Sequence, residues 1–142
     1  TSPGPVFFRQ RRSGRGNRTF TVWKLRTMRV NREADERQAQ ANDARITPIG
    51  AFLRKSNLDE LPQFFNVLWG DMSVVGARPH MLKHTEQYGA SVDKYMVRHF
   101  VKPGITGLAQ ALGLRGETPT VQSMAHRARV DRFYVENWSL LL

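Results

Sequence analysis

Two neighbouring carboxylates, Asp59 and Glu60, stand directly before Pro62 in the segment SNLDELPQFFNVLWG, residues 56–70. Acids in the first turn of a helix often do no more than complement the helix dipole, which is worth about 0.3–1 kcal/mol each. The same position also suits chemistry, because one carboxylate there could attack phosphorus or hold Mg²⁺ while its neighbour handles a proton or the metal. The helix dipole is expected to keep such a nucleophile ionised. Position alone leaves both interpretations open.

The charge of the chain indicates what these acids could act on. The 142 residues carry a formal net charge of +10, and 22 are Lys or Arg. Residues 1–32 hold nine of these cations and no acid. Arginine grips phosphate through two parallel hydrogen bonds, and basic surfaces attract anions. The composition therefore predicts a partner that is nucleic acid, a phosphorylated small molecule or acidic lipid, although a solvated basic face is the plain alternative.

Four cationic side chains are placed where they could meet the acid pair. Arg54 lies five residues before Asp59, and Lys24, Arg26 and Arg78 lie at the ends of strands or in bends. A carboxylate that attacks a phosphate needs cations nearby to suppress the repulsion between the two anions. Together these residues suit a diphosphate bound through a metal and guanidinium groups.

Other chemistries find less support in the motifs. His80 and His84 have the i, i+4 spacing of zinc ligands, but no third ligand is evident and the chain has no cysteine. There is no P-loop and no Gly-rich dinucleotide fingerprint. The second hypothesis from the residues alone is a nucleic-acid-binding module, in which Phe20 and Trp23 on a basic hairpin would stack on bases.

The elements that must position these residues begin with a hairpin. The runs VFFRQRR and TFTVWKLRTM flank a Gly-containing turn and predict two paired strands. Residues 31–43 are polar and predict either a surface helix or a mobile loop. Thr47 is a suitable N-cap for a helix that has Pro48 in its first position.

The segment that carries the acid pair predicts a second helix. Leu61, Phe64, Phe65 and Leu68 have the spacing of one apolar helix face. Pro62 is tolerated only in a first turn, so the helix is expected to begin at residues 58–61 and to end at Gly70.

The remaining chain predicts short, mixed elements. Residues 72–76 indicate a short buried strand, residues 79–89 and 91–100 two helices, residues 102–107 a Gly/Pro loop, and residues 120–140 a final helix. No stretch approaches the roughly 18 apolar residues of a spanning helix. We expect one α+β domain over residues 1–142, with an N-terminal β-hairpin, several amphipathic helices, a short strand and Pro/Gly loops.

The ordered motifs also resemble a known family. SPGPVFFRQ, WKLRTM, LRKSNLDELPQFFNVLWGDMSVVGARP, RHFVKPGITGLAQ and DRFYVENWS follow one another along nearly the whole chain. This series is similar to the bacterial polyprenyl-phosphate hexose-1-phosphate transferases, the monotopic phosphoglycosyl transferases. HMLKHTEQY and LRGET most resemble the undecaprenyl-phosphate glucose or galactose phosphotransferases, which start exopolysaccharide, capsule and O-antigen assembly.

The resemblance implies a reaction and roles for individual residues. A hexose 1-phosphate passes from a UDP-sugar to polyprenyl phosphate with release of UMP, and Mg²⁺ is the cofactor. Asp59 is implied to attack the β-phosphate, to carry a covalent phosphosugar and to help hold Mg²⁺, while Glu60 assists through the metal or a proton. Asp131 matches an acidic position without a clear role. The implied substrate-binding residues are Lys24, Arg26, Thr27, Arg54, Arg78, Pro79, Arg98, Thr106 and Gln110.

The resemblance also implies a membrane setting. The family carries a hydrophobic re-entrant helix just upstream of the SPGP segment, so the chain is expected to be a membrane-associated monotopic catalytic core that lacks this anchor. It would work at the cytoplasmic face of the bacterial inner membrane, in contact with inner-leaflet lipids. The resemblance implies no nucleic-acid partner, and it allows a homo-oligomer. Where the family usually reads G-P-R-P, this chain has Gly76-Ala77-Arg78-Pro79. A catalytically idle scaffold of an assembly complex is the remaining alternative, and the hexose is not specified.

Overall fold

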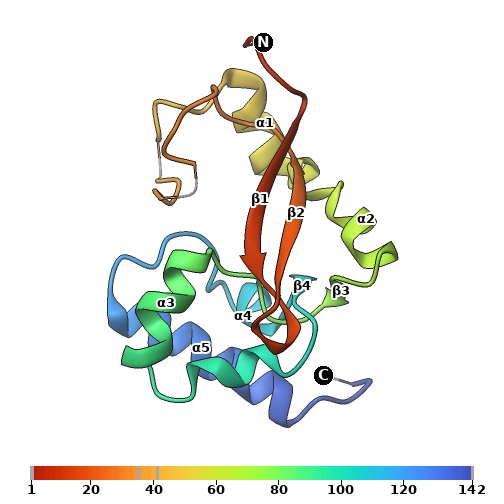
Figure 1. Ribbon diagram of the computed structural model, residues 1–142, viewed down its shortest axis with the longest axis vertical. Helices are drawn as coiled ribbons and strands as arrows, with labels where there is room; N and C mark the ends of the chain where they lie inside the picture. Colours follow the sequence, from red (N-terminus) through yellow and green to blue (C-terminus); the bar gives the residue numbers. More distant parts are fainter. Residues whose placement is uncertain (1, 35, 41, 142) are drawn as a thin grey trace.

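The computed structural model describes residues 2–34, 36–40 and 42–141. A long β-hairpin runs along the middle of the molecule, with α1 beside one end, α2 along its flank, and α3, α4 and α5 gathered at the other end (Figure 1). Strands β1 (Phe7–Ser13) and β2 (Thr19–Leu25) pair antiparallel, and the short 3₁₀ turn η1 (Arg15–Asn17) joins them. The predicted hairpin and the α+β class are thus confirmed.

The segment that joins the end of β2 at Leu25 to the start of α1 at Pro48 contains no helix or strand in its described residues. The described part of residues 31–43 forms turns without a helix, and Met28 bridges to Ile46 across their base. Helix α1 (Pro48–Ser56) begins as predicted, because the Thr47 side chain accepts a hydrogen bond from the Gly50 amide at 3.0 Å.

The segment with the acid pair folds in two pieces. Leu58–Glu60 form a 3₁₀ turn, η2, and α2 (Gln63–Leu68) starts only after Pro62. Gly70 follows α2 with a φ of 87°, the left-handed conformation that ends a helix. The predicted helix therefore exists but begins later than expected, because its first turn is tightened into a 3₁₀ turn.

Two short strands that are far apart in the sequence form a parallel pair. Strand β3 (Ser73–Val75) pairs with β4 (Gly104–Thr106) inside the segment predicted to be a Gly/Pro loop. A Cβ on Gly104 would lie 2.1 Å from the Gly76 amide nitrogen. The two backbones can therefore approach this closely only because residue 104 is a glycine. The prediction that β3 is buried is wrong: Val75 is 44% exposed, because in the described part of the chain this sheet consists of two strands.

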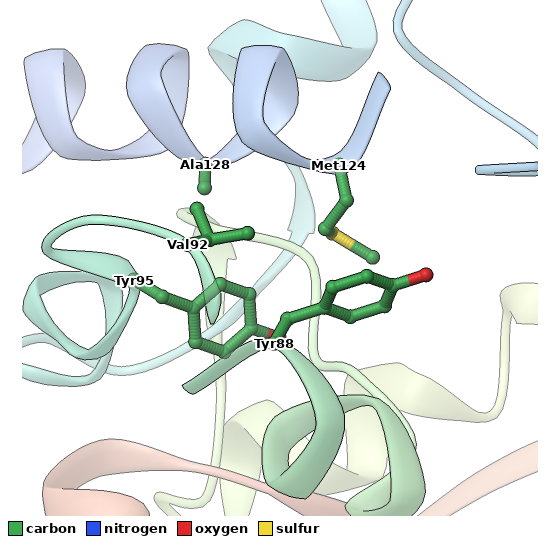
Figure 2. Packing of buried hydrophobic residues seen from close by; sticks show 5 residues of the cluster. All are labelled: Tyr88, Val92, Tyr95, Met124 and Ala128. Atoms are coloured by element: carbon green, nitrogen blue, oxygen red, sulfur yellow. The ribbon is translucent and has the colours of Figure 1, made fainter. Parts of the chain in front are cut away.

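The main hydrophobic core lies among the C-terminal elements. Tyr88 of helix α3 (Leu82–Ser91), Val92 just after it and Tyr95 of the 3₁₀ turn η3 (Tyr95–His99) pack against Met124 and Ala128 of α5 (Figure 2). Helix α4 (Leu108–Ala111) also packs on α5 (Val121–Glu136), which starts with a capping box at Thr120. This compact end supports Arg98, Arg127 and Asp131, which are all buried.

The opposite end exposes the apolar stripe predicted for α2. Leu61, Phe64 and Phe65 are about half exposed, Leu68 is 81% exposed, and Phe52 of neighbouring α1 is 62% exposed. Soluble monomers rarely leave such contiguous apolar side chains uncovered. Among the described residues, no helix has both the length and the apolar character needed to span a membrane.

Candidate active site

A sharp corner between α1 and η2 places the acid pair in the interior. Asn57 adopts a left-handed conformation with a φ of 60°, and its amide donates to the Arg54 carbonyl. The chain therefore reverses so that Arg54 and the acids of η2 face the same cavity. Asp59 is 7% exposed and Glu60 is 6% exposed, which is unusual for carboxylates outside functional sites or ion pairs.

Glu60 is held by two cations from different elements. Its Oε1 lies 3.0 Å from Lys24 Nζ and 2.7 Å from Arg78 Nη2, and its Oε2 accepts from Arg78 Nη1 at 3.4 Å. Burial opposes ionisation of Glu60, but Lys24 and Arg78 outweigh it and lower its pKa to about 2. Glu60 is thus a permanent anion near neutral pH and is unsuited to passing a proton.

The pKa of Lys24 is lowered by some of its surroundings and raised by others. Burial and the nearby Arg78 lower its pKa to about 8, although Glu60 acts to raise it. Lys24 is therefore cationic at neutral pH and loses its charge under mildly alkaline conditions.

Asp59 is in a different environment from its neighbour. In the described part of the chain, no basic side chain lies within ion-pair distance of its carboxylate. Burial raises the pKa of Asp59, Glu60 raises it further, and the more distant Lys24 and Arg54 act in the opposite direction. The helix dipole expected to favour the ionised form of Asp59 does not lower its pKa overall, because η2 is a single turn and desolvation is the largest influence.

Helix capping does not explain the acid pair either. Pro62, not an acid, occupies the N-cap position of α2, and no side chain caps that helix. The carboxylate of Glu60 instead contacts Lys24 and Arg78, across the molecule.

A cavity of about 970 Å³ opens beside the pair. Thr27 Oγ1 accepts a hydrogen bond from Arg54 Nε at 2.9 Å, which aligns the guanidinium along the wall. Arg26 also lines the cavity, but its donors are engaged by Ser2, Pro5 and Met28. The predicted site residues that line this cavity are Lys24, Arg26, Thr27, Arg54, Asp59, Glu60, Arg78 and Pro79.

Three other predicted residues do not line the cavity. Arg98 is buried, pairs with Asp131 at 2.8 Å and donates to the Arg78 carbonyl at 2.7 Å. With its amide oriented to suit its neighbours, Gln110 accepts from Arg78 Nη1 at 3.2 Å. Arg98 and Gln110 therefore support Arg78 and do not line the cavity. Thr106 does not line it either, and its carbonyl accepts a hydrogen bond from the Gly76 amide. The role of Asp131, unclear from sequence, is to pair Arg98.

The cavity also has a second basic region, which sequence reasoning did not associate with the acid pair. Among the further basic side chains in the lining are Arg12, His84, Arg115 and Arg127. Arg12 and Arg127 act electrostatically on His84, and Arg127 hydrogen-bonds the Gly116 carbonyl next to Arg115. Of these, only His84 stood out, as half of a zinc-like pair. Among the described residues, no group of three or more possible ligands for a metal ion is found. No spacing in the sequence links these four positions, since they come from a strand, two helices and a loop.

The acid pair is suited to Mg²⁺ even without a cluster of three protein ligands. Mg²⁺ is commonly bound through one or two carboxylates, with substrate phosphates and water completing its shell. Asp59 has the uncommitted carboxylate at the cavity, whereas Glu60 is engaged by Lys24 and Arg78. The donor set therefore suits a metal bound jointly with a phosphorylated substrate.

The base-stacking surface considered for a nucleic-acid-binding module is largely occupied. Trp23 contacts Phe7 and Trp69 edge to face, with ring centroids 5.8 and 6.0 Å apart, and the Arg9 guanidinium lies over its ring. The Trp23 ring is therefore already engaged by two aromatic rings and a guanidinium, which compete with stacking on bases.

Comparison with known proteins identifies the family of this chain. The whole chain, residues 1–142, matches the model of the family described as bacterial sugar transferase. The chain belongs to this family.

Individual relatives are similar over the same region. The chain is 55% identical to the UDP-glucose:undecaprenyl-phosphate glucose-1-phosphate transferase of Xanthomonas campestris pv. campestris, over all of this chain and 30% of the relative. It is 44% identical to the UDP-N-acetylgalactosamine-undecaprenyl-phosphate N-acetylgalactosaminephosphotransferase of Aeromonas hydrophila, over 99% of this chain and 33% of the relative. It is 47% identical to the exopolysaccharide production protein PSS of Rhizobium leguminosarum bv. phaseoli, over 99% of this chain and 73% of the relative. The chain thus spans about a third of the length of the first two relatives.

Proposed function

We propose that this protein transfers a hexose 1-phosphate from a UDP-sugar to a polyprenyl phosphate, undecaprenyl phosphate by analogy with its named relatives. The observation that carries the proposal is that the two neighbouring acids have different partners. Glu60 is neutralised by Lys24 and Arg78, while Asp59 is buried at a cation-lined cavity without an ion-pair partner among the described residues. A carboxylate in this setting suits attack on a phosphate.

In the proposed first step, an Asp59 carboxylate oxygen attacks the β-phosphorus of the donor. The bond between that phosphorus and the bridging oxygen breaks, and UMP leaves with the bridging oxygen. Lys24 and Arg78 lie beside the pair and reduce the repulsion between carboxylate and phosphate. In the second step, an oxygen of the polyprenyl phosphate attacks the same phosphorus and displaces Asp59. No proton is gained or lost overall, which agrees with a Glu60 that remains ionised.

Asp59 is the residue that would hold Mg²⁺, jointly with the donor phosphates. When bound, the ion would supply positive charge that favours the ionised carboxylate and stabilises the leaving phosphate. This counteracts the raised pKa of Asp59.

We also propose that the exposed apolar side chains of α1 and α2 lie against the cytoplasmic face of the bacterial inner membrane, where the lipid acceptor resides. Phe52 of α1, Leu68 of α2 and Leu61 just before α2 are more than half exposed. A membrane surface would cover them and bring the lipid phosphate to the adjacent acid pair. The relatives differ in the sugar that they are named for, so the hexose is left open.

The test uses the full-length protein in lipid nanodiscs with radiolabelled UDP-sugars, Mg²⁺ and undecaprenyl phosphate. We expect release of UMP, label on the lipid, and label on the protein when the acceptor is omitted. Asp59→Asn should abolish all three, whereas Asp71→Asn, at a partly exposed acid beyond α2, is the matched control and should retain turnover. Normal turnover by Asp59→Asn would refute the nucleophile, and an unsubstituted protein that handles no UDP-sugar would favour the idle scaffold.

A further inference from the structure

We propose that the second basic region of the cavity, formed by Arg12, His84, Arg115 and Arg127, binds the nucleoside monophosphate end of the donor. We call these four residues the distal subsite. The inference rests on the proposed function, because it assumes a nucleoside diphosphate sugar as the donor.

The size of the cavity is the first argument. The same cavity that contains Asp59 also contains the distal subsite, and its volume is about 970 Å³. Pockets for small ligands range from about 300 to 1,000 Å³. A phosphosugar alone would leave much of this space empty, whereas a nucleotide sugar extends across it.

The separation of the two regions is the second argument. Lys24, which pairs with Glu60, lies opposite Phe8 in the hairpin, and Arg12 lies four residues farther along β1. At about 3.3 Å per residue, this places the backbone of Arg12 about 13 Å along the hairpin from the residue opposite Lys24. That span suits a donor whose β-phosphorus lies at Asp59 and whose base lies beyond Arg12.

Unsatisfied buried groups are the third argument. Arg127 is 6% exposed and donates from Nη2 to the Gly116 carbonyl at 3.0 Å, but its Nε has no hydrogen-bond partner among the described residues. His80, in the same cavity wall, is 4% exposed, and its Nε2 likewise finds none in the described chain. Buried polar groups are normally paired, so a ligand that hydrogen-bonds Arg127 and His80 would satisfy both groups.

The chemistry of these groups favours a nucleotide over a second simple phosphate. The guanidinium groups of Arg115 and Arg127 offer several N–H donors to phosphate, base carbonyl and ribose oxygens. His80 hydrogen-bonds Tyr95 through Nδ1, and burial, together with Arg98, lowers its pKa well below the usual value. A neutral imidazole suits an uncharged hydroxyl or base better than a phosphate anion.

The location separates this subsite from the lipid acceptor. The exposed apolar side chains belong to α1 and α2, whereas His84 and Arg127 belong to α3 and α5 at the other end of the hairpin (Figure 1). A lipid phosphate that arrives from the apolar end meets the acid pair first. The distal subsite is therefore left for the nucleotide.

The experiment measures binding of UMP to the full-length protein in nanodiscs by calorimetry. Arg127→Gln is expected to weaken UMP binding at least tenfold, and Arg115→Gln and His84→Ala about threefold or more. The matched control is Arg129→Gln, an exposed arginine on the same helix, which should bind UMP normally. In turnover assays, the three subsite variants should raise KM for the UDP-sugar and leave KM for undecaprenyl phosphate unchanged.

The outcomes distinguish this inference from the proposed function. If the unsubstituted protein does not bind UMP, the uridine donor itself is wrong and both proposals fail. If UMP binds and Arg127→Gln, Arg115→Gln and His84→Ala all bind it normally, the distal subsite is wrong and the proposed function stands. A higher KM for the lipid phosphate alone would assign the subsite to the acceptor and overturn the inference. If Arg127→Gln unfolds, the more exposed Arg115 and His84 variants decide the question by the same criteria.

Discussion

Replacement of Glu60 by Gln tests the central electrostatic feature of the site. Glu60→Gln keeps the shape of the side chain but removes the charge that pairs with Lys24 and Arg78 at 3.0 and 2.7 Å. The two cations would then face each other in a partly buried space without an anion between them. We expect a substantial loss of stability at neutral pH and a loss of catalytic rate.

The magnitude follows from the pKa of Glu60. A fall from the ordinary value of 4.5 to about 2 corresponds to about 3 kcal/mol at about 1.4 kcal/mol for each pKa unit. Relief of the repulsion that Glu60 exerts on Asp59 offsets part of this loss. The expected cost at pH 7 is therefore about 2–3 kcal/mol. Because the folded-state pKa is depressed, this stability is present above pH 4.5 and disappears as the pH falls towards 2.

Urea unfolding of the chain, followed by tryptophan fluorescence, measures this cost. The difference between the unsubstituted chain and Glu60→Gln should shrink to about 60% of its pH 7 value at pH 3.5. Glu33→Gln is the matched control, because Glu33 pairs with Arg37 at an exposed site and should cost less than about 0.5 kcal/mol. A Glu60→Gln cost that equals the control, or that does not change with pH, would refute the reasoning.

Three further predictions test other parts of the structure. Asp131→Asn leaves Arg98 buried without its anion and should cost about 3–5 kcal/mol in urea unfolding, and a cost below about 1 kcal/mol would contradict the buried pair. Gly104→Ala places a Cβ 2.1 Å from the Gly76 nitrogen and should abolish the native near-UV circular dichroism, whereas an unchanged Tm would rule out this close approach. The transfer rate should fall as the pH rises through about 8, where Lys24 loses its proton; Lys24→Arg should maintain the rate above pH 8, and an identical alkaline limb would exclude Lys24 as its cause.

Local structure was predictable where neighbouring residues determine it. The hairpin, the Thr47 cap and the approximate place of α2 were all predicted, because alternation, capping and helical periodicity act over a few residues. The apolar stripe of α2 was also recognised, but its exposure was not. Periodicity reports which residues share a face, whereas burial depends on what the rest of the chain places against that face.

The sequence by itself determined that Asp59 and Glu60 are adjacent and that cations are abundant. Only the tertiary structure decided that Glu60 takes Lys24 and Arg78 as partners while Asp59 is left at the cavity. The physical reason is that ion pairing and desolvation act over a few ångströms in space. The residues involved come from β2, η2 and the bend after β3, and no pattern along the chain records the distances among them.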